Sequence, residues 1–277
     1  MDAGTAKRLR IGAAAAIAAA GVLTATVLAP GAAGGPAALT PDLVTLAVEQ
    51  EQIVVTREKS KTLLRLTTEV ANVGNGPLEV YPSTLSADCD GDGDPANDRD
   101  ASQRVFDDTN GSGGFEPGSD AVAAERQFGC MRYHAAHDHW HVLDFARYEL
   151  RRDPGGKPVA GSRKVGFCLL DTRRAYPGPI SPEQPRYPFG SARPEVGCDQ
   201  NATQGISAGW ADSYVFAVPG QQLDVSGLPR GRYCLVSRAD PLDLLDELDE
   251  ANNTRRVRIA LRPHRLSVRK LDGRCAG

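Results

Sequence analysis

Four of the five histidines of this chain lie in one short stretch, HAAHDHWH, at residues 134–141. His137, His139 and His141 are spaced at i, i+2 and i+4, and the residues that follow, VLDFARYEL, favour an extended strand. Alternate side chains of a strand share a face about 6.5–7 Å apart, so the three imidazoles are predicted to converge on one metal ion. Because the stretch contains no thiolate and no HExxH spacing, copper is the favoured metal and zinc the second choice.

His134 has the opposite parity on such a strand and would join the other three only if the backbone bends. It is a candidate for orienting a metal ligand, or for acting as a base. The alternative interpretation of the whole stretch is a histidine-rich run on a solvated surface. The strand pattern that continues from it favours the metal site.

The composition predicts the class of fold. With 29 glycines, 19 prolines and only 6% aromatic residues, the chain suits many turns between short strands. The run LLRLTTEVANVGNGPLEVYP from Leu63 alternates apolar residues, breaks at Gly74–Gly76 and then resumes, which is typical of a strand, a turn and a second strand. We therefore expect a mostly β fold: a single antiparallel β-sandwich-like domain with long irregular loops and little helix.

The N-terminus has the order of segments of a secretory signal. Lys7, Arg8 and Arg10 precede an apolar run over residues 11–29, and small residues follow. Residues 1–35 are predicted to be a signal peptide, cleaved or retained as an anchor, and residues 36–277 the functional domain. The protein is then secreted, or held at the outer face of the membrane, with no stable membrane insertion after cleavage. A net charge of −3 suggests neither nucleic acid nor an anionic membrane as partner.

Six dispersed cysteines occur without any CxxC pair. In an exported protein this pattern favours disulfides over zinc or redox chemistry. Among the fifteen pairings we expect the sequential one, which is Cys89–Cys130, Cys168–Cys198 and Cys234–Cys275.

An acidic stretch, DCDGDGDPANDRD at residues 88–100, resembles the first half of a calcium-binding EF-hand loop. Its twelfth position is Arg99, where a bidentate glutamate is needed. The stretch is either a calcium loop or a solvated acidic turn.

Four motifs occurring in one order, HAAHDHWH, SRKVGFCLLDT, GISAGWADSY and DELDEANN, resemble the catalytic domain of the lysyl oxidases. The resemblance covers roughly residues 42–261. It implies a copper-dependent amine oxidase with His137, His139 and His141 as copper ligands. It further implies that Lys164 and Tyr214 form a lysine tyrosylquinone, with which a primary amine or a peptidyl lysine is converted to an aldehyde, ammonia and hydrogen peroxide.

The resemblance also implies a calcium site, made by all-oxygen ligands. Its residues would be Asp42, Leu43 (through its carbonyl), Glu247, Asp249, Asn252 and Asn253. Asp212, two residues before Tyr214, is a candidate for the base that removes the substrate's α proton. For these residues the alternatives are a turn aspartate at 212 and a capped turn at DELDEANN.

The chain departs from the family pattern at two places. Ala136 replaces a cysteine of the histidine cluster, and the segment Thr172–Thr203 is longer than the family's connection between the lysine and the tyrosine. Two other functions stay open: an exported copper-binding protein without catalysis, and a surface β-sandwich module stabilised by calcium. The substrate class is a primary amine or a lysine-containing peptide or protein.

Overall fold

The computed structural model describes residues 36–85, 88–162, 166–189, 198 and 203–275. The predicted signal segment and Lys164 lie outside the described residues. Residues 36–277 group into one compact unit. No helix in the described part of the chain is long and apolar enough to cross a membrane.

The mostly β, antiparallel fold class is confirmed, with only two short 3-10 helices among the described residues, η1 (Gln50–Gln52) and η2 (Pro263–Arg265). The largest sheet has the order β12 (Gly166–Phe167), β9 (His139–Leu143), β8 (Ala121–His134), β7 (Asp98–Asp107), β6 (Leu78–Pro82) and β14 (Gln204–Ile206), with β1 (Ala38–Leu39) also on β7. A five-stranded sheet has the order β11 (Pro158–Gly161), β10 (Ala146–Arg152), β17 (Gly231–Ala239), β18 (Thr254–Arg262) and β19 (Ser267–Lys270).

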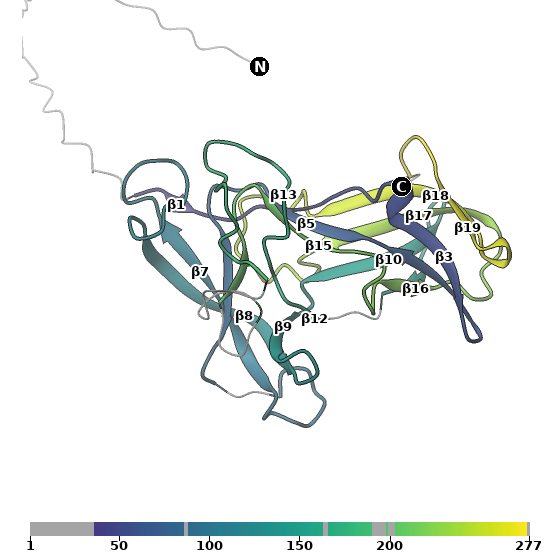
Figure 1. The fold of residues 1–277 in the computed structure, drawn as a ribbon, viewed down its shortest axis with the longest axis horizontal. Helices are drawn as coiled ribbons and strands as arrows, with labels where there is room; N and C mark the ends of the chain where they lie inside the picture. The colour runs from purple at the N-terminus through teal and green to yellow at the C-terminus, as the bar shows by residue number, and fades with distance from the viewer. Residues whose placement is uncertain (1–35, 86–87, 163–165, 190–197, 199–202, 276–277) are drawn as a thin grey trace, which may run out of the picture. The chain divides into compact units, whose positions relative to one another are not determined.

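Two smaller sheets complete the domain. One has the order β13 (Arg173–Arg174), β15 (Trp210–Tyr214), β5 (Thr68–Asn72) and β2 (Leu43–Thr45), and the other has β16 (Gln222–Asp224), β4 (Lys61–Leu66) and β3 (Ile53–Glu58). One hydrophobic core takes side chains from all four sheets. In Figure 1, β7, β8 and β9 lie at one end of this domain, and β10, β17 and β18 lie at the other.

The strand, turn and strand predicted within residues 63–82 are confirmed, and the two strands that flank the turn belong to different sheets. β5 pairs with β15 and β2, whereas β6 pairs with β7 and β14 in a different sheet. The turn between them packs tightly on the N-terminal segment, where a Cβ at Gly76 would lie 2.2 Å from the carbonyl oxygen of Leu39. The glycines therefore serve close backbone packing where the chain passes from one sheet to another.

The sequential disulfide pairing is confirmed, with Cα–Cα distances of 5.6, 5.9 and 5.7 Å for Cys89–Cys130, Cys168–Cys198 and Cys234–Cys275. Such bonds restrict the unfolded chain and are each worth about 3–4 kcal/mol in the chain-entropy model. The described part of the segment Thr172–Thr203 is mostly irregular and exposed outside β13, but Tyr187 anchors it to the core. Tyr187 is fully buried there, and its hydroxyl donates to Glu79 over 2.6 Å.

Candidate active site

The four clustered histidines lie on a hairpin and not on the single extended strand that the sequence predicted. β8 ends at His134, the chain turns over residues 135–138, and β9 begins at His139. The amides of His137 and Asp138 both donate to the His134 carbonyl oxygen, over 2.9 and 3.0 Å, and Asp138 adopts a left-handed φ of 58°. Spacing of two residues fits a strand, but this local turn reverses the chain within the motif.

The hairpin nevertheless brings the predicted ligands together. His139 and His141 alternate along β9 with Trp140 and Val142, which are buried on the opposite face. The Nε2 atoms of His139 and His141 are 3.0 Å apart, and one ring nitrogen from each of His137, His139 and His141 lies within 4.8 Å of the others. Nitrogens at such separations suit ligands about 2 Å from one shared ion.

His134 joins this cluster because the backbone bends, as the sequence required. It pairs directly opposite His139 across the hairpin, and cross-strand partners share a face. Its ring centroid lies 4.1 Å from that of His137 and 5.0 Å from that of His141. Its buried Nδ1 has no hydrogen-bond partner among the described residues, so a fourth imidazole is available at the cluster.

The surroundings of His139 favour its neutral imidazole. Burial lowers the pKa of His139, and the neighbouring His137 lowers it further. The neutral ring is the form that binds a metal. The donor set and its protonation therefore fit a copper ion, or another metal that prefers nitrogen ligands.

The short strand β12 lies against the histidine hairpin. Gly166 pairs with Leu143 of β9, and a Cβ at Gly166 would lie 2.9 Å from the Cβ of His141. This position therefore needs glycine, because any larger side chain would meet the His141 ring. Lys164, two residues earlier, lies outside the described residues, so its side chain is not placed.

The segment Gly166–Cys168 also contacts Tyr214. The hydroxyl of Tyr214 donates to the Cys168 carbonyl oxygen over 2.6 Å and accepts the Cys168 amide over 2.9 Å. The ring packs edge-on against Phe167, with centroids 5.4 Å apart. Burial raises the pKa of Tyr214 well above its usual value, and the charge of Asp212 raises it further, so the phenol is protonated.

Asp212 lies on β15, two residues before Tyr214, and is 3% exposed. Its charge also contributes to raising the pKa of Tyr148, although burial is the larger cause there. Asp212 is therefore a buried carboxylate close to two phenols. The alternative interpretation, a turn aspartate, is excluded because the residue belongs to β15. Its role as a base stays a prediction.

The residues predicted to bind calcium come together from distant parts of the chain. The amide of Leu43 donates to Glu247 over 2.6 Å, and Asn252 donates to Asp42 over 2.7 Å. Asn253 donates to the other Glu247 oxygen over 3.1 Å. Asp249 is exposed, and its carboxylate accepts the amide of Ala251.

Two further carboxylates at this place were missed in the sequence. One oxygen each from Asp240, Glu247 and Glu250 lies within 4.8 Å of the others. Asp240 precedes the DELDEANN motif, and the amides of Leu244 and Leu245 hold its carboxylate in place. The chain folds back over residues 240–247, and only this brings Asp240 close to Glu247. The acidic composition of the segment was the one signal of a cation site in the sequence.

This carboxylate cluster has the character of a cation site. Burial, together with the charges of Glu250 and Asp240, raises the pKa of Glu247 to about 8. The Oδ1 atoms of Asn252 and Asn253 are buried and have no hydrogen-bond partner among the described residues. Clustered carboxylates and unused amide oxygens are the ligands that calcium prefers.

The acidic loop at residues 88–100 resembles an EF-hand loop less closely in the structure than in the sequence. Oxygens of Asp88, Asp90 and Asp92 lie within 4.8 Å of one another, but the guanidinium of Arg132 forms an ion pair with Asp90. The amides of Asp92 and Gly93 are hydrogen-bonded to Asp90 and Asp88. The loop is thus closed by its own backbone and by an arginine, which is how a solvated acidic turn satisfies its charges.

Comparison with known proteins places these features in one family. The model of the family described as lysyl oxidase matches residues 118–271, more than half of the chain. Within that range lie the histidine hairpin, Tyr214, and Asp240, Glu247 and Glu250 of the carboxylate cluster.

Individual relatives agree with this match. The chain is 31% identical over 133 residues to protein-lysine 6-oxidase of Rattus norvegicus, which covers 48% of this chain and 29% of that protein. It is 31% identical to protein-lysine 6-oxidase of Sus scrofa (48% of this chain, 47% of that protein) and 30% identical to human lysyl oxidase homolog 1 (46% and 20%). The matched region thus spans less than half the length of each of these relatives. On the family match, this chain belongs to the lysyl oxidase family.

Proposed function

We propose that the chain is a copper-dependent amine oxidase, which converts a primary amine or a peptidyl lysine, with oxygen and water, to an aldehyde, ammonia and hydrogen peroxide. One observation carries the proposal. The segment Gly166–Cys168 contacts His141 of the histidine cluster on one side and Tyr214 on the other, and it begins two residues after Lys164. The candidate metal ligands and Tyr214 therefore belong to one neighbourhood, and Lys164 precedes the segment that joins them by two residues in the sequence.

Copper would be held by His137, His139 and His141. The fit is supported by the converging ring nitrogens and by the lowered pKa of His139. Bound copper would supply the one-electron and oxygen chemistry for which the protein's own side chains are unsuited. His134, with its unused Nδ1, would orient a neighbouring ligand.

Lys164 and Tyr214 would supply the atoms of a lysine tyrosylquinone, whose electrophilic carbonyl is what a primary amine attacks. Tyr214 is held by two hydrogen bonds to the Cys168 backbone and by the Phe167 ring, which fixes the position of its ring relative to the segment after Lys164. Lys164 can attack only as the neutral amine, so we expect its pKa to be lowered. Asp212 is the candidate to accept the α proton of the substrate, since it lies on the same strand two residues away.

The carboxylate cluster would bind calcium through Glu247, Asp42, Asn252 and Asn253. Asp240 and Glu250 would add negative charge beside the ion. Asp249 and the Leu43 carbonyl remain candidate ligands. The cluster joins the N-terminal strand β2 to the loop before β18, so calcium would stabilise the fold. The three disulfides suit an oxidising compartment outside the cytoplasm, in line with the signal peptide proposed for residues 1–35.

The test is to load the full chain with copper in air, record the visible spectrum, add phenylhydrazine and map the peptides. A labelled crosslinked peptide joining the segments of Lys164 and Tyr214 is expected. The matched control is Tyr214→Phe, which keeps the packing on Phe167 and loses only hydroxyl hydrogen bonds worth about 1 kcal/mol each. If both peptides stay unmodified in fully copper-loaded protein, the chain is a copper-binding protein without quinone catalysis.

A further inference from the structure

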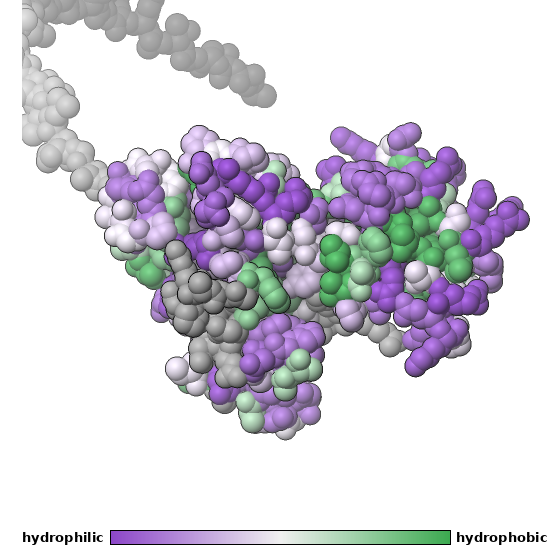
Figure 2. Space-filling view, in the orientation of Figure 1, coloured by the Kyte–Doolittle hydropathy of each residue, from purple (hydrophilic) through white to green (hydrophobic). Residues whose placement is uncertain are grey.

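Positive charge is concentrated at the C-terminal end of the chain. Residues 254–275 contain seven arginines, one lysine and His264 against one acidic residue, Asp272. The net charge of the whole chain is nevertheless −3, so the other residues carry a net negative charge. The total therefore does not reveal the basic segment. In Figure 2 the end of the domain that carries β18 and β19 shows hydrophilic side chains around a more apolar surface.

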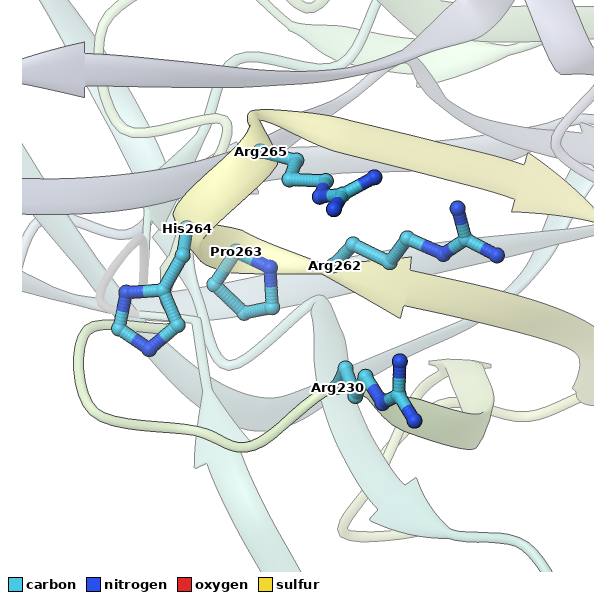
Figure 3. Close-up of a pocket in the computed structure, with 5 residues that line it drawn as sticks. All are labelled: Arg230, Arg262, Pro263, His264 and Arg265. Carbon is cyan, nitrogen blue, oxygen red and sulfur yellow. The ribbon is translucent and has the colours of Figure 1, made fainter.

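Three of the basic side chains line one cavity of about 300 Å³, together with Pro263 and His264. Arg262 ends β18, Arg265 lies in η2, and Arg230 comes from the separate turn that precedes β17. In Figure 3 the side chains of Arg262 and Arg265 extend in the same direction, with Arg230 across from them on its own segment. The fold thus gathers guanidinium groups that the sequence separates.

These three arginines have no acidic partner within the described residues. No ion pair involves Arg230, Arg262 or Arg265, and no carboxylate lines the cavity. Neighbouring basic residues differ: Arg258 pairs with Asp153, and Lys270 pairs with Glu49. The positive charge of the cavity is therefore left uncompensated.

The basic surface continues beyond the cavity along the outer face of the five-stranded sheet. Val257, Ile259 and Leu261 of β18 are buried, so the alternate positions, including Arg256 and Arg262, face outward. Ala260 lies between Arg232 of β17 and Arg269 of β19, which are its cross-strand partners on the same outer face. These arginines, here called the arginine track, come from three adjacent strands, so the basic surface extends from the cavity over β17, β18 and β19.

The side chains that are absent from this track restrict its partner. The aromatic residues of the five strands, Tyr148 and Tyr233, are 3% and 0% exposed, so the described strands offer no ring on which nucleic-acid bases could stack. Leu266 is the exposed large apolar residue beside η2, and a single leucine is a poor membrane anchor. A partner with several anionic groups along its length, and without bases or lipid, fits best.

We propose that this cavity and the arginine track bind a linear anionic polysaccharide, with one sulfate, phosphate or carboxylate group seated among Arg230, Arg262 and Arg265. Planar guanidinium groups bind such oxyanions by paired hydrogen bonds. The site lies on the sheet of β17, β18 and β19, whereas the four clustered histidines lie on the hairpin of β8 and β9. It is a binding function separate from the amine oxidase chemistry.

The test is titration of the full chain with fluorescent dextran sulfate at several NaCl concentrations. The triple variant Arg230→Gln, Arg262→Gln, Arg265→Gln is expected to bind about tenfold or more weakly. The number of ionic contacts derived from the slope of log affinity against log salt concentration should fall by about two to three. All three side chains are exposed, so thermal unfolding should be unchanged, and Arg265→Gln alone should give part of the loss.

The matched control removes the same charge elsewhere, through Arg57→Gln, Lys59→Gln and Lys157→Gln, three exposed residues outside the cavity. It should bind almost as the parent does. The proposal is overturned if the control weakens binding as much as the cavity variant, or if uncharged dextran binds equally well. It is also overturned if single-stranded DNA or vesicles of anionic lipid bind the chain while dextran sulfate does not.

Discussion

The histidine cluster and the carboxylate cluster are both candidate metal sites, but they are assembled differently. All four histidines lie on one hairpin over residues 134–141, so the ligands are neighbours in the sequence. In the carboxylate cluster the amide of Leu43 meets Glu247, 204 residues later. The first site depends on a local turn, whereas the second exists only when the whole domain is folded.

The two clusters also differ in how they affect the stability of the metal-free fold. Burial lowers the pKa of His139 and thereby favours the uncharged ring, which needs no counter-ion. Burial raises the pKa of Glu247, and the nearby charges of Glu250 and Asp240 raise it further, so ionised carboxylates oppose folding there. We therefore expect copper to change activity with little effect on stability, and calcium to change stability.

The largest effect should follow from His139→Ala. Loss of one of three predicted ligands should weaken copper binding at least about 100-fold, more than the loss of a residue that merely supports a ligand, while the unfolding temperature of the metal-free protein stays almost constant. Metal analysis after dialysis and phenylhydrazine reactivity measure the result. His264→Ala, the histidine outside the hairpin, is the control. Full copper retention in His139→Ala would remove the hairpin as the copper site.

The next effect concerns calcium. Calcium at about 100 times its dissociation constant should stabilise the fold by about 2.7 kcal/mol, which raises the unfolding temperature by roughly 5–10 °C for a domain of this size. Glu247→Gln should abolish this shift. Asp92→Asn, in the acidic loop closed by Arg132, should keep it. A shift lost in Asp92→Asn and kept in Glu247→Gln would transfer the calcium site to that loop.

The pH dependence of stability sharpens the same contrast. In calcium-free protein the folded-state pKa of Glu247, about 8, lies above its ordinary value of 4.5, so the folded chain holds a proton that the unfolded chain has lost. Stability should therefore fall as the pH rises from about 4.5 to 8, and then level off. After allowance for partial exposure of the side chain, the change should be on the order of 2 kcal/mol.

Denaturant titrations in the presence of a chelator measure this slope. Glu247→Gln should flatten it and make the calcium-free protein more stable at pH 8. An unchanged slope in the variant would assign the pH dependence to other groups.

Sequence reasoning identified the histidines because their spacing within eight residues is a local property. It missed the turn, because spacing of two residues is compatible with a strand and Asp138, which tolerates the left-handed conformation of a turn, was the one local signal against a strand. It also missed Asp240 and the pairing of β5 with β15, both of which depend on contacts across the fold. The arginine cavity was hidden for a related reason: a net charge of −3 is a sum over the chain that conceals the basic residues 254–275, and only the fold brings Arg230 beside them.

The smallest effect tests the contact between β12 and the histidine hairpin. Gly166→Ala would place a Cβ 2.9 Å from that of His141 and 3.1 Å from its Nδ1, so the imidazole must shift away from the cluster. Outer-shell changes of this kind weaken metal binding about tenfold or more, and a tenfold change corresponds to about 1.4 kcal/mol. Gly161→Ala is the control, since its Cβ would meet only the Tyr148 carbonyl oxygen at 4.0 Å. Equal copper affinity in both variants would mean that β12 does not position His141, and the link proposed between the copper ligands and the segment after Lys164 would be lost.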